Sequence, residues 1–401
     1  MKDKIPIASQ NKGICQKQEL INANMVIKKV LKLLLLQLIL ILSLISCGET
    51  GRSDRPVATD LIDWDEVLEQ EENWYSSSEA IRIADNVLFY QHQNGGWPKN
   101  IDMAQVLSEF EKDSIREEQA AGGTTLSNIT IDNGATYTQM RYLARVYDVT
   151  DAERFRASFL RAVDYLLEAQ YETGGWPQYY PIREGYYENI TFNDGAMIGT
   201  MRMLRDVAEA EELYTFVDST RRQRASAAVD KGVEAILNMQ ITQDGQRTAW
   251  CAQHDPETLE PAWARSYEPP SIAGAASAGI VRFLMVIEEP TPEILAAVEG
   301  AVEWYRDTAI HGYKYEGFID EEGREDKRFV EDLDEGPLWA RFYEIETNRP
   351  IFMNRDSDIF YEYSKVPQER RAGYDWYGDW AVELLAEEYH QWKDKHNSST
   401  E

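Results

Sequence analysis

A Gly-Gly-Trp-Pro motif occurs twice in this chain, at residues 95–98 and 174–177, and each copy is followed by a second shared motif. The second motif reads Ile-Asp-Asn-Gly at residues 131–134 and Phe-Asn-Asp-Gly at residues 192–195. Fainter copies of the unit lie at residues 237–245, 271–284 and 332–344. Units repeated in this way bury their apolar faces against one another, so they stack into a superhelix or close into a ring.

The segments between these motifs have the periodicity of helices, with apolar residues at i, i+3, i+4 and i+7. The clearest are residues 80–93, 137–150, 154–170, 197–210, 227–240, 294–310 and 380–395. Runs of alternating Val, Ile and Thr are nearly absent. We therefore predict an all-α fold, an (α/α) toroid or incomplete barrel built from repeated helix pairs, with the loops gathered at one end.

The Gly-Gly-Trp-Pro loops suit such a ring, because paired glycines permit positive φ and the proline fixes the direction in which the chain leaves. Trp97 and Trp176 have two interpretations. They line a cleft made by ring closure, or they plug the core of a plain helix-to-helix turn.

The N-terminal region predicts export. Three lysines precede an apolar run at residues 33–42, and the run ends near Ser46-Cys47, which is typical of a lipoprotein signal peptide. Cleavage before Cys47 would leave its thiol for lipidation. The alternative is an uncleaved transmembrane anchor. We expect a protein that is exported and lipid-anchored to a bacterial membrane, at the outer membrane or cell surface.

The same reading divides the chain into five parts. Residues 1–24 are an upstream extension from a misplaced start, 25–46 the signal peptide, 47–75 a polar tether, 76–392 the toroid domain and 393–401 a polar tail.

Charge restricts the partners. The chain has a formal charge of −29, and residues 1–47 carry seven Lys against two acidic residues, so the remainder carries −34. We therefore do not expect the protein to bind nucleic acid. A polyanionic substrate would also be repelled at long range. It would need a locally basic cleft or a bound divalent cation.

Asp132-Asn133-Gly134 and Asn193-Asp194-Gly195 each lie where a loop enters a helix. Asp and Asn at such places often cap the helix. Two copies in successive units would instead bring two carboxylates and two amide oxygens to the same end of a toroid, and these are ligands that suit calcium. Both interpretations stay open at this point.

Residues 248–255 and 263–270 form a poorly helical stretch that contains His254, Arg265 and Tyr267. Loops of such composition bind ligands more often than they fill cores. A lone His is usually structural, and no zinc-type spacing occurs.

Residues 338–356 carry three arginines among aromatic residues, Arg341, Arg349 and Arg355. In an acidic protein this is a local positive patch, and guanidinium groups suit carboxylates. The alternative is charge balance with neighbouring Asp and Glu.

Six motifs in this order resemble the family 10 polysaccharide lyases, which are pectate lyases. They are NGGWPKNID, TIDNGATYTQMRYLA, GGWPQYYP, ITFNDGAM, WCAQHDP with PAWARSYEPPS, and PLWARFYEIETNRPIF. The match runs from about residue 75 to about residue 390.

The resemblance implies cleavage of α-1,4-linked polygalacturonate by calcium-assisted anti β-elimination, giving 4,5-unsaturated oligogalacturonides. Asp132 and Asp194 match the acidic positions near Ca²⁺, with Asp132 also catalytic, and Arg265 matches the base. An arginine base is unusual because its pKa is high, so it requires basic or metal neighbours.

The positions suited to the substrate are Lys99, Asn133, Tyr267, Arg341, Arg349 and Arg355. One turn departs from the family pattern, because Ser357 replaces a glycine after Arg355-Asp356. We expect a monomer.

Two other functions fit the residues. In one, a glycoside hydrolase on the same toroid uses Asp132 and Asp194 as acid and base. In the other, a non-catalytic glycan-binding lipoprotein stacks sugars on Trp97, Trp176 and Trp250. Loss of activity in EDTA and an unsaturated product would distinguish the lyase from both.

Overall fold

The structure is a computed structural model, which describes residues 62–122 and 127–397. Cys47, the predicted signal peptide and most of the predicted tether lie outside the described residues. Ten α-helices occur in the described part. They are α2 (Ser78–Tyr90), α3 (Glu109–Ala121), α4 (Tyr137–Thr150), α5 (Glu153–Glu168), α6 (Ala196–Glu209), α7 (Ser219–Met239), α8 (Gly274–Met285), α9 (Pro292–Asp307), α10 (Gln368–Ala372) and α11 (Tyr389–Asn397). None of these described helices combines the length and apolar character needed to cross a bilayer.

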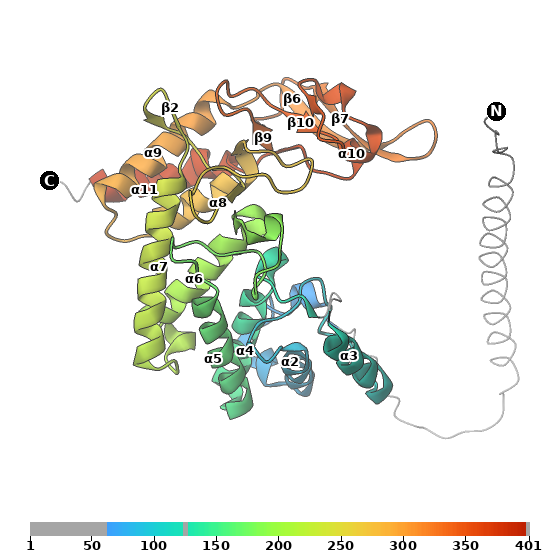
Figure 1. Ribbon diagram of the computed structural model, residues 1–401, viewed down its shortest axis with the longest axis vertical. Coiled ribbons are helices and arrows are strands. Elements are labelled where there is room, and N and C mark those ends of the chain that lie inside the picture. Colours follow the sequence, from blue (N-terminus) through green and yellow to red (C-terminus); the bar gives the residue numbers. More distant parts are fainter. Residues whose placement is uncertain (1–61, 123–126, 398–401) are drawn as a thin grey trace, which may run out of the picture. The chain divides into compact units, whose positions relative to one another are not determined.

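The long helices form two rows (Figure 1). In one row α2, α5, α7 and α9 contact one another in succession, and in the other α4, α6 and α8 do so. Helices that follow one another in sequence, α4 with α5, α6 with α7 and α8 with α9, also pack together across the rows. This double row of helix pairs confirms the predicted (α/α) toroid.

A tryptophan after each helix of the first row anchors the repeat. Trp97, Trp176, Trp250 and Trp339 are fully buried. The indole Nε1 of each donates a hydrogen bond to a carbonyl of the preceding helix, at 2.7, 2.8, 2.7 and 2.9 Å. The core-plugging interpretation is therefore correct. The proposed sugar stacking on Trp97, Trp176 and Trp250 is wrong, because their rings are inaccessible.

A glutamine at the end of each helix ties successive repeats together. Nε2 of Gln91, Gln170 and Gln240 donates to a carbonyl in its own loop, each at 2.8 Å. The same nitrogen also donates to a carbonyl of the next helix in the row, at 2.8–2.9 Å. Each glutamine thus links one helix pair to its successor, which explains why it recurs in the sequence.

The first glycine of each Gly-Gly pair is required by a close approach of backbone. Gly95 has φ 103° and Gly174 has φ 100°. A Cβ atom at either position would lie 2.2 Å from the carbonyl oxygen of Arg161 or Lys231. No other residue type can occupy these positions without moving a helix.

Short strands join the loops of neighbouring repeats. They are β1 (Ile190–Thr191) with β4 (Gln253–His254), β5 (Ile272–Ala273) with β9 (Phe342–Tyr343), β8 (Trp339–Ala340) with β12 (Tyr377–Gly378), β10 (Phe352–Met353) with β11 (Ile359–Phe360), and β2 (Thr242–Gln243) with β3 (Gln246–Arg247). All five pairs are antiparallel. They hold the loop ends of the repeats in a fixed order.

One longer hairpin was not predicted. Strands β6 (Tyr313–Ile319) and β7 (Glu325–Glu331) pair antiparallel between α9 and Trp339. Most of its side chains are partly or fully exposed, and it is stabilised by stacking of Phe329 on Tyr313 and Tyr377, at 4.6 and 4.3 Å between ring centroids. The first strand alternates only over Tyr313–Glu316, and the second strand shows no alternation, so the strand signal in the sequence is weak.

Part of the segment assigned from sequence to the tether packs on the domain. The 3₁₀ helices η1 (Trp64–Glu66) and η2 (Glu72–Ser76) lie there. Val67 and Tyr75 within this segment are buried in the core.

Candidate active site

The two Asp/Asn-Gly turns share a backbone conformation. The central residues Asn133 and Asp194 both adopt a left-handed conformation, with φ 51° and φ 49°. The two turns, η4 (Asp132–Gly134) and η6 (Asn193–Gly195), contact each other. Neither turn supplies a side-chain cap to α4 or α6. The helix-cap interpretation is therefore wrong, and the carboxylates are available for another role.

Asp132 is buried and held by two donors. Lys99 Nζ and Gln178 Nε2 both donate to Oδ2, the latter at 2.6 Å, while Oδ1 has no hydrogen-bond partner among the described residues. Lys99 and Gln178 each lie two residues after a buried tryptophan, so the repeat brings both to one carboxylate. Burial lowers the pKa of Lys99, but the hydrogen bond and charge of Asp132 outweigh this and raise it above its usual value.

Asp194 has a more open environment than Asp132. It is exposed, and its Oδ2 accepts a hydrogen bond from Asn193 Nδ2 at 2.6 Å. Partial removal from solvent and the nearby charge of Asp132 raise the pKa of Asp194, and the guanidinium groups of Arg341 and Arg265 oppose the rise. The charges of Asp132, Arg341 and Arg265 therefore all influence the protonation of Asp194.

Arg265 is held by a bidentate ion pair. Its Nε and one terminal nitrogen donate to the two oxygens of Glu268 at 2.8 and 2.6 Å. Glu268 is buried and also accepts a hydrogen bond from the Tyr374 hydroxyl at 2.7 Å. Burial lowers the pKa of Arg265, but the hydrogen bonds and charge of Glu268 raise it well above the usual arginine value. The ligand-free site thus keeps Arg265 protonated.

Arg341 lies against aromatic rings and faces a cavity. Its Nε donates to the Asp375 carbonyl at 2.6 Å, and its guanidinium is 4.8 Å from the Tyr374 ring centroid. Arg341 and Asp194 line the same cavity of about 370 Å³, together with Arg141 and Arg202. An acidic protein thus has a cluster of guanidinium groups beside an exposed carboxylate.

Arg355 and Tyr267 lie on the same side as Arg265. Arg355 is exposed, pairs with Glu369 at 2.7 Å, and lies 5.6 Å from the Tyr267 ring centroid. Arg265 lies 5.2 Å from the same ring. The replacement at Ser357 does not prevent the turn, because Ser357 adopts φ 67°.

Two other predicted candidates lie apart from this cluster. Arg349 stacks on Tyr361 at 3.9 Å, and no contact among the described residues links it to the catalytic candidates. His254 is buried, with Nδ1 2.8 Å from the Leu259 carbonyl oxygen. Burial lowers the pKa of His254 to about 4. His254 is therefore a structural residue.

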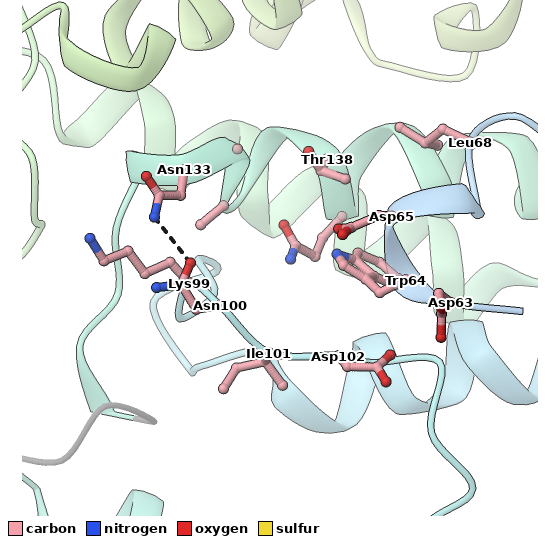
Figure 2. Close-up of a pocket in the computed structure, with 13 residues that line it drawn as sticks. Asp63, Trp64, Asp65, Leu68, Lys99, Asn100, Ile101, Asp102, Asn133 and Thr138 are labelled. Carbon is pink, nitrogen blue, oxygen red and sulfur yellow. Dashed lines mark hydrogen bonds between the residues drawn. The ribbon is translucent and has the colours of Figure 1, made fainter. Parts of the chain in front are cut away.

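Asn133 occupies the edge of a second, larger cavity. Its Nδ2 donates to Asn100 Oδ1 at 3.0 Å, and both residues line this cavity of about 640 Å³ with Lys99 (Figure 2). Asn133 is exposed and so remains accessible to a ligand.

Three residues of the site were not assigned a role from sequence. Gln178, Glu268 and Arg202 each complete a feature described above. The repeat alignment contained the signal for two of them, because Gln178 occupies the position of Lys99 and Arg202 that of Arg141. The sequence allowed a surface ion pair between Glu268 and Arg265, but it did not indicate that Glu268 is buried and bonded to Tyr374.

The donors fit calcium in part. Asp132 has a buried oxygen without a partner, and Asp194 presents an exposed carboxylate beside it. Within the described ranges, however, no group of three or more Asp, Glu, His or Cys side chains converges. Protein oxygens alone are too few for the six to eight ligands of Ca²⁺, so substrate or water would have to supply the others.

Comparison with known proteins shows the family of this chain. The pectic acid lyase family model matches residues 91–385. A solved mutant of a family 10 polysaccharide lyase from Cellvibrio cellulosa, in complex with trigalacturonic acid, is 34% identical with a TM-score of 0.67, over 81% of this chain and 97% of the other. A second structure of a family 10 polysaccharide lyase from the same organism is 33% identical with a TM-score of 0.67, over 83% and 97% of the two chains. Among curated proteins no match was found.

The family model covers most of the chain, and the two structural matches extend over nearly the whole of their own chains. The alternative of a glycoside hydrolase is therefore not supported. This chain belongs to the pectic acid lyase family and is a polysaccharide lyase of family 10, a pectate lyase.

Proposed function

We propose that this enzyme cleaves α-1,4-linked polygalacturonate by calcium-assisted anti β-elimination and releases 4,5-unsaturated oligogalacturonides. The observation that carries the proposal is the placement of two interacting carboxylates, Asp132 and Asp194, beside the guanidinium groups of Arg265 and Arg341. A related structure holds trigalacturonic acid, which supports the same class of substrate here.

In this proposal Asp194 and Asp132 hold Ca²⁺ with a uronate carboxylate of the substrate. The cation would withdraw electron density from that carboxylate and acidify the C5 proton. Lys99, Asn133, Arg341 and Arg355 orient neighbouring uronate groups, with Tyr267 supporting Arg355. Lys99 fixes the orientation of Asp132, and Gln178 adds a second hydrogen bond to the same oxygen.

Arg265 would accept the C5 proton. The C4–O bond then breaks, a C4–C5 double bond forms, and the departing oxygen takes a proton. In the ligand-free site Glu268 stabilises the protonated guanidinium, so the base must first lose a proton. The positive charge of Arg341, on the same side of the site, favours that loss.

The test is the ultraviolet absorbance of the unsaturated product formed from polygalacturonate. We expect activity with Ca²⁺, none in EDTA and none with Arg265→Ala. Arg154→Ala is the matched control. Arg154 is an exposed arginine of α5 that pairs with Asp85 of α2, and neither helix carries a candidate catalytic residue. Full activity of Arg265→Ala would refute the assignment of the base, and full activity in EDTA would refute the role of calcium.

We further propose that the enzyme acts as a monomer exported and anchored by a lipid on Cys47. The lipoprotein-type sequence before Cys47 supports this. Expression of Cys47→Ser in a bacterial host should release the protein from the membrane fraction, while the native sequence remains there and incorporates labelled fatty acid. Equal membrane association of both proteins would contradict lipidation. Light scattering of the domain after Cys47 tests the monomer.

A further inference from the structure

The 640 Å³ cavity beside Lys99 and Asn133 differs in charge from the rest of the site. Its wall opposite Lys99 and Asn133 is formed by Asp63, Trp64 and Asp65 of the N-terminal segment, and Asp102 lies below (Figure 2). None of the three carboxylates forms an ion pair with a described residue. The cavity thus extends from the positively charged Lys99 to an acidic recess. We use this term for the part that is lined by Asp63, Trp64, Asp65 and Asp102.

A buried amide side chain also borders this cavity. Gln139 lines it and is 3% exposed. Its Nε2 makes a weak contact with Met103 Sδ at 3.8 Å, whereas Oε1 has no hydrogen-bond partner among the described residues. A buried carbonyl oxygen without a donor costs free energy unless a ligand or water supplies one. The recess therefore requires hydrogen-bond donors.

The three carboxylates of the recess are hydrogen-bond acceptors. Asp63 makes no cap interaction, Asp65 is exposed, and Asp102 Oδ1 accepts from the Ala104 amide at 3.0 Å. Trp64 adds an aromatic surface, and one of its edges packs on Tyr142 at 5.7 Å. Hydroxyl groups on a sugar ring match this combination of acceptors and an aromatic side chain.

A uronate in the recess would bring a fourth negative charge near three carboxylates. We infer that this recess is a distal subsite that accepts an uncharged sugar unit, such as a methyl-esterified galacturonate, in preference to a charged one. The inference rests on the proposed function, because the subsite extends the same substrate cleft.

The test uses oligogalacturonides of one length whose terminal unit is charged, methyl-esterified or reduced to galactose. Pairs of these substrates compete for the enzyme with Ca²⁺, and the product ratio gives the ratio of kcat/KM. We expect the native enzyme to prefer both uncharged ends about fivefold, the scale of the repulsion between two like charges a few ångströms apart in water. The double variant Asp63→Asn/Asp65→Asn should bring the ratio close to one by improving cleavage of the charged substrate.

Glu71→Gln/Glu72→Gln is the control, because these exposed residues lie in the same segment, remove the same charge and do not line the cavity. It should keep the native preference. High salt should weaken the preference of the native enzyme and leave that of Asp63→Asn/Asp65→Asn unchanged. A preference for one uncharged end alone would support the subsite and identify its ligand as the ester or the neutral sugar.

An unchanged ratio in Asp63→Asn/Asp65→Asn, or an equal change in the control, would overturn the inference. Absence of unsaturated product from every substrate would instead refute the proposed function. In that case the same preference is measured as a ratio of dissociation constants by calorimetry, since no turnover disturbs the mixture. Equal constants for charged and uncharged ligands would then overturn the subsite.

Discussion

The turn at Asp132 and the turn at Asp194 have the same backbone but opposite surroundings. In the first, the carboxylate is the buried residue before the left-handed position, and Lys99 and Gln178 hold it. In the second, the carboxylate is at the left-handed position itself, exposed, with Asn193 as its donor. Exchanging Asp and Asn within one repeated turn thus produces one anchored carboxylate and one available carboxylate. The difference predicts that Asp132 contributes to stability in addition to cation binding, whereas Asp194 contributes to cation binding alone.

The largest effect should come from Asp194→Asn. Loss of the available carboxylate should reduce kcat/KM by about 100- to 1000-fold, the scale for removing one group that stabilises transition-state charge. The melting temperature should stay close to the native value, because Asp194 has no buried partner. Calcium titration of activity and thermal unfolding measure the two quantities. A large loss of stability with unchanged calcium dependence would reverse the comparison.

Asp132→Asn should lower the free energy of unfolding as well as the affinity for calcium, whereas Asp194→Asn affects only the latter. Lys99 would keep its charge in a half-buried position without a counter-ion, which should cost about 3 kcal/mol of the free energy of unfolding. Adding Lys99→Met should restore part of that loss, since it removes the unpaired charge. Denaturant unfolding of the two single variants and the double variant checks this. Additive losses would show that the pair does not act as a unit.

The loss of stability at acid pH should depend on His254, which lies near the turn at Asp194. His254 pairs with Ile190 in the short strand before that turn and has a pKa of about 4 in the folded protein, below its ordinary unfolded value of 6.5. Stability is therefore complete above pH 6.5 and falls as the pH decreases, by about 2 kcal/mol at pH 5, because only the unfolded chain binds the proton.

His254→Asn should remove this contribution, since an amide nitrogen can still donate to the Leu259 carbonyl. Thermal unfolding at pH 7 and pH 5 then gives a smaller difference for the variant than for the native protein. An identical pH dependence in both would show that His254 is protonated in the folded state.

The smallest effect should follow Gln178→Ala. Loss of one hydrogen bond to the carboxylate of Asp132 should cost about 1 kcal/mol of stability. Lys99 remains on the same oxygen, so calcium dependence should not change. Denaturant unfolding checks the first expectation and a calcium titration the second. A shift of the calcium optimum would mean that Gln178 orients Asp132 for the cation.

The repeat and the helical periodicity were sufficient to predict the toroid. They also identified the two turns, because Asp, Asn and Gly in succession favour a turn with positive φ. The hairpin β6–β7 was missed, since its stability comes from aromatic stacking with the distant Tyr377. Within the site, the sequence allowed a surface ion pair between Arg265 and Glu268, but it did not show that Glu268 is buried. An ion pair depends on which rotamers a cavity permits, and spacing does not reveal that.

The four buried tryptophans have one consequence for how such an enzyme diversifies. Each indole fixes its loop to the preceding helix, so the residue two positions later can change its chemistry without disturbing the core. Those residues are Lys99, Gln178, Ala252 and Arg341. Three carry hydrogen-bond donors at the site, and the fourth is an alanine that lines the same cavity as Arg341. Substrate range can therefore evolve at Ala252 by a single substitution, independently of folding.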